Sequence, residues 1–578
     1  MEVKEQPMTQ QERDRRKANI LKRRKREVRR KILSFVILIA SICLGVFCVK
    51  KFGASKERAN LDKYYGIKSE NQLAVIIDNQ VIGAKGMIEN QTLYVEYGVV
   101  RDYLNARFYV DMTENLLLYT LPQGTIEAEV GSNQYTLQKD VKTKEYPILK
   151  MEGDTAYVAL RFVQEYTNLD FTYYKNPNRV MIVSEWGDTV VAEVRKGAKV
   201  REKDSIKSPI LTEVAKKESV TVIESKGKWK QIRTEDGIIG YIKSGSLKKE
   251  STKKLSREFE KQVYPNISKD YTINVAWHMV TERDANNEVL EKIADAKGLT
   301  TIAPTWFSVK NTKGALSSLA SAKYVEYAQR YGVEVWAMIQ DNDEAETYEL
   351  LSRTSYRENL INQLVAEALK NKIDGINVNF ENVSEECAEH YLQFLRELSL
   401  KCRQMEIVLS VNRPVTANYD MKEQGEVVDY VILMSYDEHG LDSEKSGPGA
   451  SLPFVEKELA QALKQVPKEK LIQAIPFFTR LWKEEEESEK VSSFAYGMSR
   501  IQNIIKDAGA KIAEDKETGL HYAEWQNSDG VYKVWIEDKD SIEKKLVLMK
   551  EAELAGVAAW RMGFETEDVW ELILKYVN

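Results

Sequence analysis

Apolar, β-rich runs alternate with helical patterns eight times between Tyr271 and the end of the 578-residue chain. Alternation of this kind is typical of parallel strands, because each helix returns the chain to the start of the next strand. Eight such units predict a closed (β/α)8 barrel with its helices outside, whose functional site lies at the C-terminal ends of the strands. The candidate strands are INVAWHM, TTIAPTWFS, VEVWAMI, GINVNFE, EIVLSVN, VVDYVILMSYD, LIQAIPFFT and GVAAWRMG.

The fourth candidate strand carries polar side chains on one face. It lies in the stretch DGINVNFE, and successive side chains of a strand point to opposite faces. One face, which we expect against the helices, holds Ile376, Val378 and Phe380. The other, which we expect inside the barrel, holds Asn377, Asn379 and Glu381. Three buried polar groups in a row cost stability unless they are hydrogen-bonded, which favours a functional site; a satisfied internal polar network is the alternative.

A second constraint lies near the N-terminus. Ile32–Val49 is an 18-residue stretch without a charge, close to the minimum length for a membrane-spanning helix. Residues 1–31 carry 13 Lys or Arg against five Asp or Glu, so they form a basic segment that we expect in the cytoplasm. We therefore expect residues 32–49 to cross the membrane once, with the remainder extracellular. A cleaved signal peptide is the alternative, although Lys50 and Lys51 stand where a small-residue cleavage site belongs.

Charge and composition exclude several classes of function. The net charge of -5 combines +8 in residues 1–31 with -13 in the rest, and an acidic body argues against nucleic acid as a partner. Four cysteines cannot form a disulfide framework in so long a chain. The four histidines show no metal-ligand spacing, and no phosphate-cradling glycine loop is evident, so we expect no metal or cofactor.

An internal repeat occupies residues 66–187. TLYVEYGVVRDYLNARFYVDMTENLLLYT, from Thr92, recurs with an offset of 63 as TAYVALRFVQEYTNLDFTYYKNPNRVMIVS, from Thr155. Each unit is predicted to form a short strand, a helix and two further strands, and two copies imply a paired module. The segment resembles the N-terminal domain of copper amine oxidases, which recurs as a stalk on bacterial surface proteins. It contains no histidine, so the resemblance implies no copper chemistry.

Residues 188–248 are short alternating strands punctuated by glycine, which predict a small all-β barrel. The pattern GKWKQIRTEDGIIGYI resembles bacterial Src-homology-3-like domains, which commonly bind cell-wall peptides or glycans. Trp229 and Tyr241 are groove candidates under that resemblance, and core residues under the alternative. The charged residues 249–270 are predicted to be a linker.

The stretch from Asp374 to Glu381 resembles the D-x-x-D-x-D-x-E signature of glycoside hydrolase family 18, the chitinase-like family that includes bacterial cell-wall and spore enzymes. The likeness covers residues 271–578. MSYDEHG, from Met434, resembles the family's M-x-Y-D-x-x-G on the sixth strand. LIQAIPFFTRLW resembles its seventh strand, and GVAAWRMG its eighth.

The resemblance implies substrate-assisted hydrolysis. Glu381 would protonate the glycosidic oxygen while the substrate's own 2-acetamido carbonyl attacks the anomeric carbon. Tyr436 would bond the acetamido oxygen, and Asn379 would accept the acetamido N–H. The other implied substrate-binding residues are Asp374, Asn377, Met434, Asp437, Trp560 as the floor of the sugar subsite, and Trp525 on an inserted hairpin.

The chain departs from the family signature at two positions. Asn377 and Asn379 stand where the family has its two central aspartates. At position 379 a neutral bond replaces an ion-assisted one, which costs roughly 1–2 kcal/mol or about 5- to 30-fold in rate. We expect this change to slow turnover without abolishing it.

The predicted architecture is multidomain: a transmembrane helix, an α+β stalk, a small all-β barrel and a C-terminal (β/α)8 TIM barrel. The predicted function is that of a membrane-anchored extracellular glycosidase that cleaves β-1,4 bonds of N-acetylglucosamine-containing polymer, peptidoglycan or chitin-like. Its expected partners are that polysaccharide, the cell wall and, through residues 32–49, the membrane. The alternative is a catalytically weakened or inactive glycan-binding protein of the cell wall.

Overall fold

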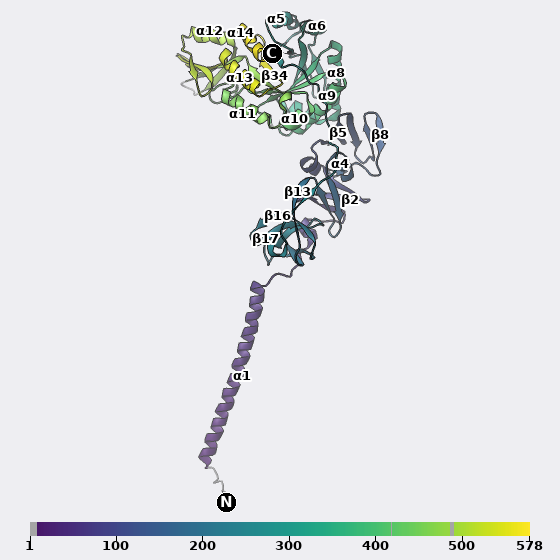
Figure 1. Cartoon of the computed structure of the whole chain (residues 1–578), viewed down its shortest axis with the longest axis vertical. Helices are drawn as coiled ribbons and strands as arrows, with labels where there is room; N and C mark the ends of the chain where they lie inside the picture. The colour runs from purple at the N-terminus through teal and green to yellow at the C-terminus, as the bar shows by residue number, and fades with distance from the viewer. Residues whose placement is uncertain (1–8, 418, 486–489, 578) are drawn as a thin grey trace. The chain divides into compact units, whose positions relative to one another are not determined.

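The computed structural model describes residues 9–417, 419–485 and 490–577 (Figure 1). The chain forms two compact units, each built from two segments. Unit 1 comprises Met1–Glu96 and Gln164–Phe259. Unit 2 comprises Tyr97–Val163 and Glu260–Asn578.

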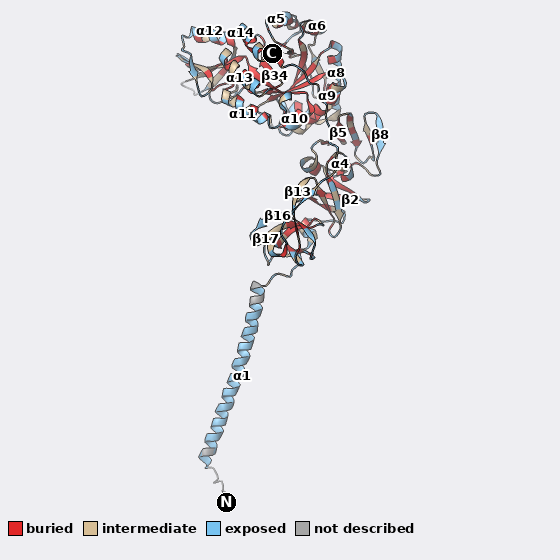
Figure 2. Ribbon diagram, in the orientation of Figure 1, coloured by how far each residue is buried: buried red, intermediate tan, exposed pale blue. Residues whose placement is uncertain are grey.

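Unit 1 begins with the long helix α1 (Gln10–Phe52). Its apolar part is long and apolar enough to cross a membrane, with a mean hydropathy of 2.1 over its best 18-residue window. The residues from Ile32 to Phe47 are exposed, and the ribbon of α1 is mostly pale blue in Figure 2. The first eight residues of the predicted basic segment lie outside the described residues.

The rest of unit 1 is mainly β-structure. After α2 (Leu61–Tyr65), one sheet runs in the order β11-β12-β1-β2-β3, with β1 parallel to β12 and antiparallel to β2. A second sheet runs β15-β14-β18-β17-β16-β13-β19 and encloses a small core that includes Val194, Val200 and Ile232. Trp229 and Tyr241 are half-buried and lie outside that core. The strands are β1 (Gln72–Ile77), β2 (Gln80–Glu89), β3 (Thr92–Glu96), β11 (Asp170–Tyr174), β12 (Arg179–Val183), β13 (Gly187–Glu193), β14 (Ala198–Arg201), β15 (Ile210–Val214), β16 (Ser219–Lys226), β17 (Trp229–Arg233), β18 (Ile239–Lys243) and β19 (Ser251–Leu255).

Unit 2 contains the predicted eight-stranded parallel barrel. The strands pair in the order β21-β20-β34-β28-β27-β26-β25-β24, and β24 pairs with β21 to close the ring. They are β20 (Ile273–His278), β21 (Thr301–Pro304), β24 (Glu334–Gln340), β25 (Gly375–Asn379), β26 (Val408–Pro414), β27 (Tyr430–Met434), β28 (Leu471–Pro476) and β34 (Gly556–Trp560). The eightfold alternation therefore predicted the fold of this half of the chain.

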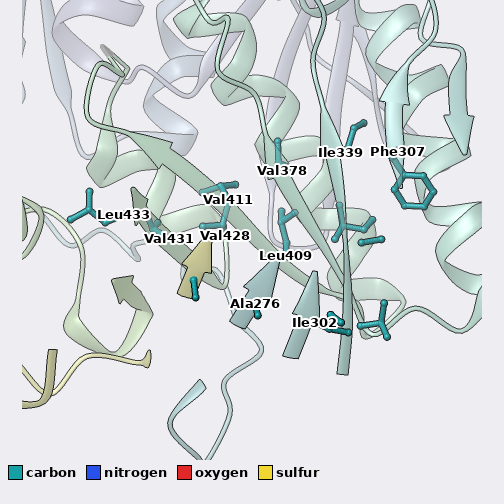
Figure 3. Packing of buried hydrophobic residues seen from close by; sticks show 14 of the residues in the cluster. Ala276, Ile302, Phe307, Ile339, Val378, Leu409, Val411, Val428, Val431 and Leu433 are labelled. Carbon is teal, nitrogen blue, oxygen red and sulfur yellow. The ribbon is translucent and has the colours of Figure 1, made fainter. Parts of the chain in front are cut away.

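Two apolar layers hold the barrel together. Outward-facing residues such as Val378, Leu409 and Val431 pack under the helices (Figure 3). Inward-facing residues such as Trp336 and Ile432 fill the interior. The helices are α5 (Val289–Ala294), α6 (Ala322–Arg330), α7 (Glu344–Ser352), α8 (Thr354–Asn371), α9 (Ala388–Gln404), α10 (Met421–Val427), α11 (Leu452–Ala462), α13 (Lys539–Glu551) and α14 (Glu567–Val577).

An inserted sheet follows the seventh barrel strand. Its order is β30-β29-β33-β32-β31, and α12 (Met498–Asp507) packs on it through Ile501 and Ile505. The strands are β29 (Phe478–Glu484), β30 (Val491–Gly497), β31 (Ala513–Asp515), β32 (Leu520–Asn527) and β33 (Gly530–Ile536). This is the region for which an inserted hairpin was predicted.

The first segment of unit 2 packs directly on the barrel helices. Its sheet β4-β5-β6-β7-β8 consists of β4 (Phe108–Asp111), β5 (Leu116–Leu121), β6 (Gly124–Glu129), β7 (Gln134–Leu137) and β8 (Asp140–Thr143). Asp111, at the end of β4, accepts bonds from the backbone N–H and the hydroxyl of Thr354, both 2.7 Å long. Glu114 accepts the N–H of Ser355 at 3.0 Å. These carboxylates cap the N-terminus of α8, where N–H groups otherwise lack helical partners.

We expect Asp111→Ala to destabilise unit 2 by about 2–3 kcal/mol, because it leaves the partly buried N–H of Thr354 without its partner. The measurement is the thermal unfolding midpoint of the purified protein. Asp154→Ala, in the exposed turn between β9 (Leu149–Glu152) and β10 (Thr155–Ala159), is the matched control and should leave the midpoint nearly unchanged. Equal midpoints for the two variants would contradict the capping role.

Candidate active site

A pocket of about 230 Å³ lies where barrel strands β25, β26, β27 and β34 end. Six of the predicted site residues line it together: Asn379, Glu381, Met434, Tyr436, Asp437 and Trp560. The carboxyl group of Glu381 is accessible, since this residue is exposed. The remaining lining residues are Asn412, Phe478, Arg480, Ala495 and Phe564.

A chain of hydrogen bonds leads from the barrel interior to Glu381. The indole Nε1 of Trp277 donates to Oδ1 of Asn377 at 3.0 Å. Asn377 donates to Oδ1 of Asn412, and Asn412 donates to Oδ1 of Asn379, both at 2.8 Å. Asn379 then donates from Nδ2 to Oε1 of Glu381 at 2.8 Å. The polar face of β25 is thus a satisfied network whose last member is the candidate acid.

Tyr436 lies at the wall of the pocket with 5% of its surface exposed. Burial, reinforced by the nearby carboxylates of Glu381 and Asp437, raises the pKa of this phenol well above its ordinary value. Its ring packs edge-on against Phe478 at 6.0 Å between centroids. Tyr436 therefore stays protonated at any working pH and can donate a hydrogen bond into the pocket.

Asp437 and Arg480 form an ion pair at the edge of the pocket. Nη2 of Arg480 lies 2.6 Å from Oδ1 of Asp437, and Nε of the same guanidinium lies 3.1 Å from that oxygen. Asp437 has a φ of 59°, a left-handed conformation that is uncommon outside glycine and that often marks functional sites. The pair fixes the carboxylate of Asp437 beside Tyr436.

Trp560 ends β34 and forms part of the pocket lining. Its ring lies 5.7 Å from that of Trp277, inclined by 59°. Trp277 is fully buried, so it supports Trp560 from inside the barrel. An indole that is held from behind and open in front offers a flat face for a sugar ring.

Three predicted site residues do not line the pocket. Asn377 is fully buried beneath it, within the hydrogen-bond chain. Asp374 precedes β25, at the opposite end of the strand from Glu381, and accepts the backbone N–H of Val335 at 2.8 Å. Trp525 lies on β32, where its ring stacks on Tyr532 at 5.4 Å and packs against the core of the inserted sheet.

Sequence reasoning missed three polar residues at the site. Asn412 points into the barrel from β26, and the alternation of Leu409, Ser410, Val411 and Asn412 carries the same signal as in the fourth strand. Arg480 gave no local signal, because it lies on β29 of the inserted sheet whereas its partner Asp437 follows β27. Asp341 follows β24, and its position just after a barrel strand could have drawn attention to it.

Asp341 fixes the backbone around the candidate acid. Its carboxylate accepts the N–H of Glu381 at 3.2 Å and that of Asn382 at 2.7 Å. Burial raises the pKa of Asp341 to about 6, although these backbone bonds act in the opposite direction. Asp341 therefore titrates within the working range of most enzymes.

A carboxyl whose folded-state pKa is raised stabilises the fold while it is protonated, and this contribution is lost as the pH rises through about 6. We therefore expect the unfolding midpoint of the wild type to fall relative to Asp341→Asn as the pH rises from about 4 to about 6. The exposed Glu349→Gln on α7 is the control, with a constant difference from the wild type. A constant difference for Asp341→Asn would show that the carboxyl does not titrate in this range.

A larger cavity of about 500 Å³ lies elsewhere in unit 2, between the β5–β8 sheet and helices α8 and α9. Its lining includes Glu127, Glu358 and Lys401 and contains none of the predicted site residues. It lies outside the C-terminal mouth of the barrel, so we place the active site in the smaller pocket. Among the described residues, no group of three or more His, Cys, Asp or Glu side chains is arranged to hold a metal ion.

Comparison with known proteins identifies three family matches along the chain. Residues 275–565 match the family model for glycosyl hydrolases family 18, residues 196–248 that for the bacterial SH3 domain, and residues 76–182 that for the copper amine oxidase N-terminal domain. An uncharacterized glycosylase of Bacillus subtilis (strain 168), YvbX, is 26% identical over 280 residues, which cover 45% of this chain and 80% of that protein.

A second curated protein and one solved structure also match part of the chain. The cortical fragment-lytic enzyme of Bacillus anthracis is 24% identical over 238 residues, covering 39% of this chain and 55% of that protein, so the match spans about half of that relative. The crystal structure of the Bacillus cereus spore cortex-lytic enzyme SleL superposes with a TM-score of 0.49 at 22% identity, over 56% of this chain and 79% of that one. The family match takes in half of the sequence and every residue of the pocket, and the protein belongs to glycosyl hydrolases family 18.

Proposed function

We propose that this glycoside hydrolase cleaves β-1,4 bonds of an N-acetylglucosamine-containing polymer, peptidoglycan or chitin-like, by substrate-assisted catalysis. The observation that carries the proposal is an accessible carboxyl, Glu381, in a pocket that also presents the buried phenol of Tyr436 and the indole of Trp560. The other carboxylate of the pocket, Asp437, is paired with Arg480, and an unpaired acid with a neutral donor suits a substrate that supplies its own nucleophile. The names of the cortical fragment-lytic relatives favour peptidoglycan.

The proposed reaction follows from these positions. Glu381 transfers its proton to the glycosidic oxygen as the bond to the anomeric carbon breaks. The acetamido oxygen of the substrate attacks that carbon, and Tyr436 donates a hydrogen bond to this oxygen. Water then opens the cyclic intermediate while the Glu381 carboxylate takes its proton, which restores the acid. Trp560 supports the sugar ring, and Asp437 with Arg480 contacts its edge.

The test is hydrolysis of chitooligosaccharides and of peptidoglycan glycan strands by the full chain in detergent. Two displacements at the anomeric carbon regenerate its configuration, so NMR should show the β-anomer first. The α-anomer as first product would reject the substrate-assisted mechanism. The second candidate function, glycan binding without turnover, is favoured by the neutral Asn379 beside the acid, and would be indicated by saturable binding without products.

We also propose that residues 32–49 anchor the enzyme in the membrane, with residues 1–31 in the cytoplasm and the remainder outside. The uncharged 18-residue stretch, its basic flank and the exposure of the side chains from Ile32 to Phe47 support this placement. Protease added to intact cells should digest the part of the chain that follows the membrane span and leave a small membrane-bound fragment. Release of the whole protein by carbonate washing would point to a cleaved signal peptide instead.

A further inference from the structure

The orientation of Asn379 is set by residues that lie deeper in the barrel. An indole N–H can only donate, so Asn377 must turn its oxygen toward Trp277, 3.0 Å away. The amide nitrogen of Asn377 then faces Oδ1 of Asn412 at 2.8 Å and Oγ of Ser410 at 2.9 Å. The direction of the first link is therefore fixed by the chemistry of its donor.

The direction of this first hydrogen bond determines the direction of the hydrogen bonds that follow it. With its oxygen taken by Asn377, Asn412 has only N–H groups left for Asn379, and it donates to Oδ1 at 2.8 Å. Asn379 in turn presents Nδ2 to Glu381 at 2.8 Å. Rotating any one amide by 180° would place two donors or two acceptors face to face. These amides are almost fully buried, so water could not repair such a mismatch.

We propose that Asn412 is a positioning residue of the hydrolase, which holds Asn379 with its N–H on Oε1 of Glu381 and thereby places the acidic proton on Oε2. This inference rests on the proposed function. A carboxyl oxygen that accepts an N–H bond is the less favourable site for the acidic proton, so the proton is carried by the other oxygen. When the Oε2–H bond breaks and the proton passes to the glycosidic oxygen, the electron pair stays on the carboxylate. The bond from Asn379 then becomes charge-assisted and strengthens.

Other charged or titratable groups also face Glu381. Asp341 bonds its backbone N–H from the end of β24, and the phenol of Tyr436 stands in the same pocket at the end of β27. Asp437 and Arg480 are paired at the pocket edge. A substitution at position 412 leaves these groups unchanged, so its effect on the pH dependence can be assigned to the amide chain.

The test compares Asn412→Asp with Asn412→Leu. An aspartate at 412 accepts from Asn377 and has only an acceptor left for Asn379, so the amide of Asn379 must turn its oxygen toward Glu381. A facing acceptor and a nearby negative charge both favour the protonated acid, so the pH–rate profile should move to higher pH by about one unit. Asn412→Leu removes the link without reversing it, and should lower kcat with little change of KM or of the profile.

Trp277→Phe distinguishes the effect of the hydrogen-bond direction from the effect of an added charge. It removes the N–H that orients Asn377 and introduces no carboxylate. Its profile should move in the same direction as that of Asn412→Asp, by a smaller amount. A residue that only supported the fold would lower the activity of all three variants without moving any profile. The proposal is overturned if the Asn412→Asp profile superposes on that of the wild type.

A second readout works without turnover. Infrared difference spectra recorded during a pH titration contain the carboxyl band of Glu381, which is identified by its loss in Glu381→Gln. In Asn412→Asp this band should persist to higher pH than in the wild type. If no variant hydrolyses any glycan but the band shifts, the proposed function fails and the positioning role stands. If the band titrates identically in both proteins, the positioning role fails whatever the activity.

Discussion

Glu381→Gln should lower kcat by about 10²–10⁴-fold while leaving glycan affinity nearly unchanged, because proton donation by a placed acid contributes about that factor. The hydrogen bond from Asn379 makes Glu381→Gln a specific test of proton donation. The amide oxygen of a glutamine can still accept the 2.8 Å bond from Asn379, so the pocket keeps its arrangement and loses only the transferable proton. The measurement is kcat and KM on chitooligosaccharides, together with calorimetric binding.

The matched control for this variant is Glu385→Gln. Glu385 is an exposed carboxylate in the loop that follows the acid, outside the residues that line the pocket. It should leave both constants unchanged. If Glu381→Gln hydrolyses the substrate as fast as the wild type, another residue is the general acid, and Asp341 is the next carboxyl to test. Loss of binding in Glu381→Gln would indicate a role in holding the sugar.

The fourth barrel strand shows why part of this site could be predicted from the sequence. Period-two alternation is a property of the extended backbone, so Ile376 and Val378 had to face the helices once Asn377 and Asn379 faced inward. The same geometry means that not every residue of the family signature can line one pocket, because the signature spans both ends of a strand. Asp374 precedes Glu381 by seven residues, about 23 Å of extended chain, and it lies at the far end of the barrel.

Long-range partners could not be predicted in this way. Nothing near Asp111 in the sequence indicates that its carboxylate caps a helix beginning 243 residues later. Likewise, the pairing of Arg480 with Asp437 depends on how the end of β27 meets β29 of the inserted sheet. The direction of the amide chain could not be predicted from the sequence either, because it depends on which atom of Asn377 meets the indole of Trp277. The sequence therefore predicted which residues are polar and face inward, and the structure showed which residues they bond and in which direction.

Asn379→Asp should raise kcat by about 5- to 30-fold, the inverse of the loss expected from the neutral amide. The oxygen of the new carboxylate that remains bonded to Asn412 keeps its 2.8 Å link, and the other oxygen replaces the N–H that now faces Glu381. Two carboxyl groups at that separation cannot both ionise, so they share a proton and the acid stays protonated to higher pH. The new charge also faces the positive ring of the cyclic intermediate.

The measurement is kcat across the pH range for the wild type, Asn379→Asp and Asn379→Leu. The aspartate variant should gain most on the alkaline side of the profile, where the wild-type acid has lost its proton. The leucine variant removes both hydrogen bonds and should fall below the wild type. Turnover by Asn379→Asp alone would identify the natural chain as a glycan-binding protein that has lost catalysis through this one amide. A gain in neither kcat nor pH range would show that the charge at position 379 does not limit the reaction, and that the amide chain through Asn412 serves the acid as well as a carboxylate does.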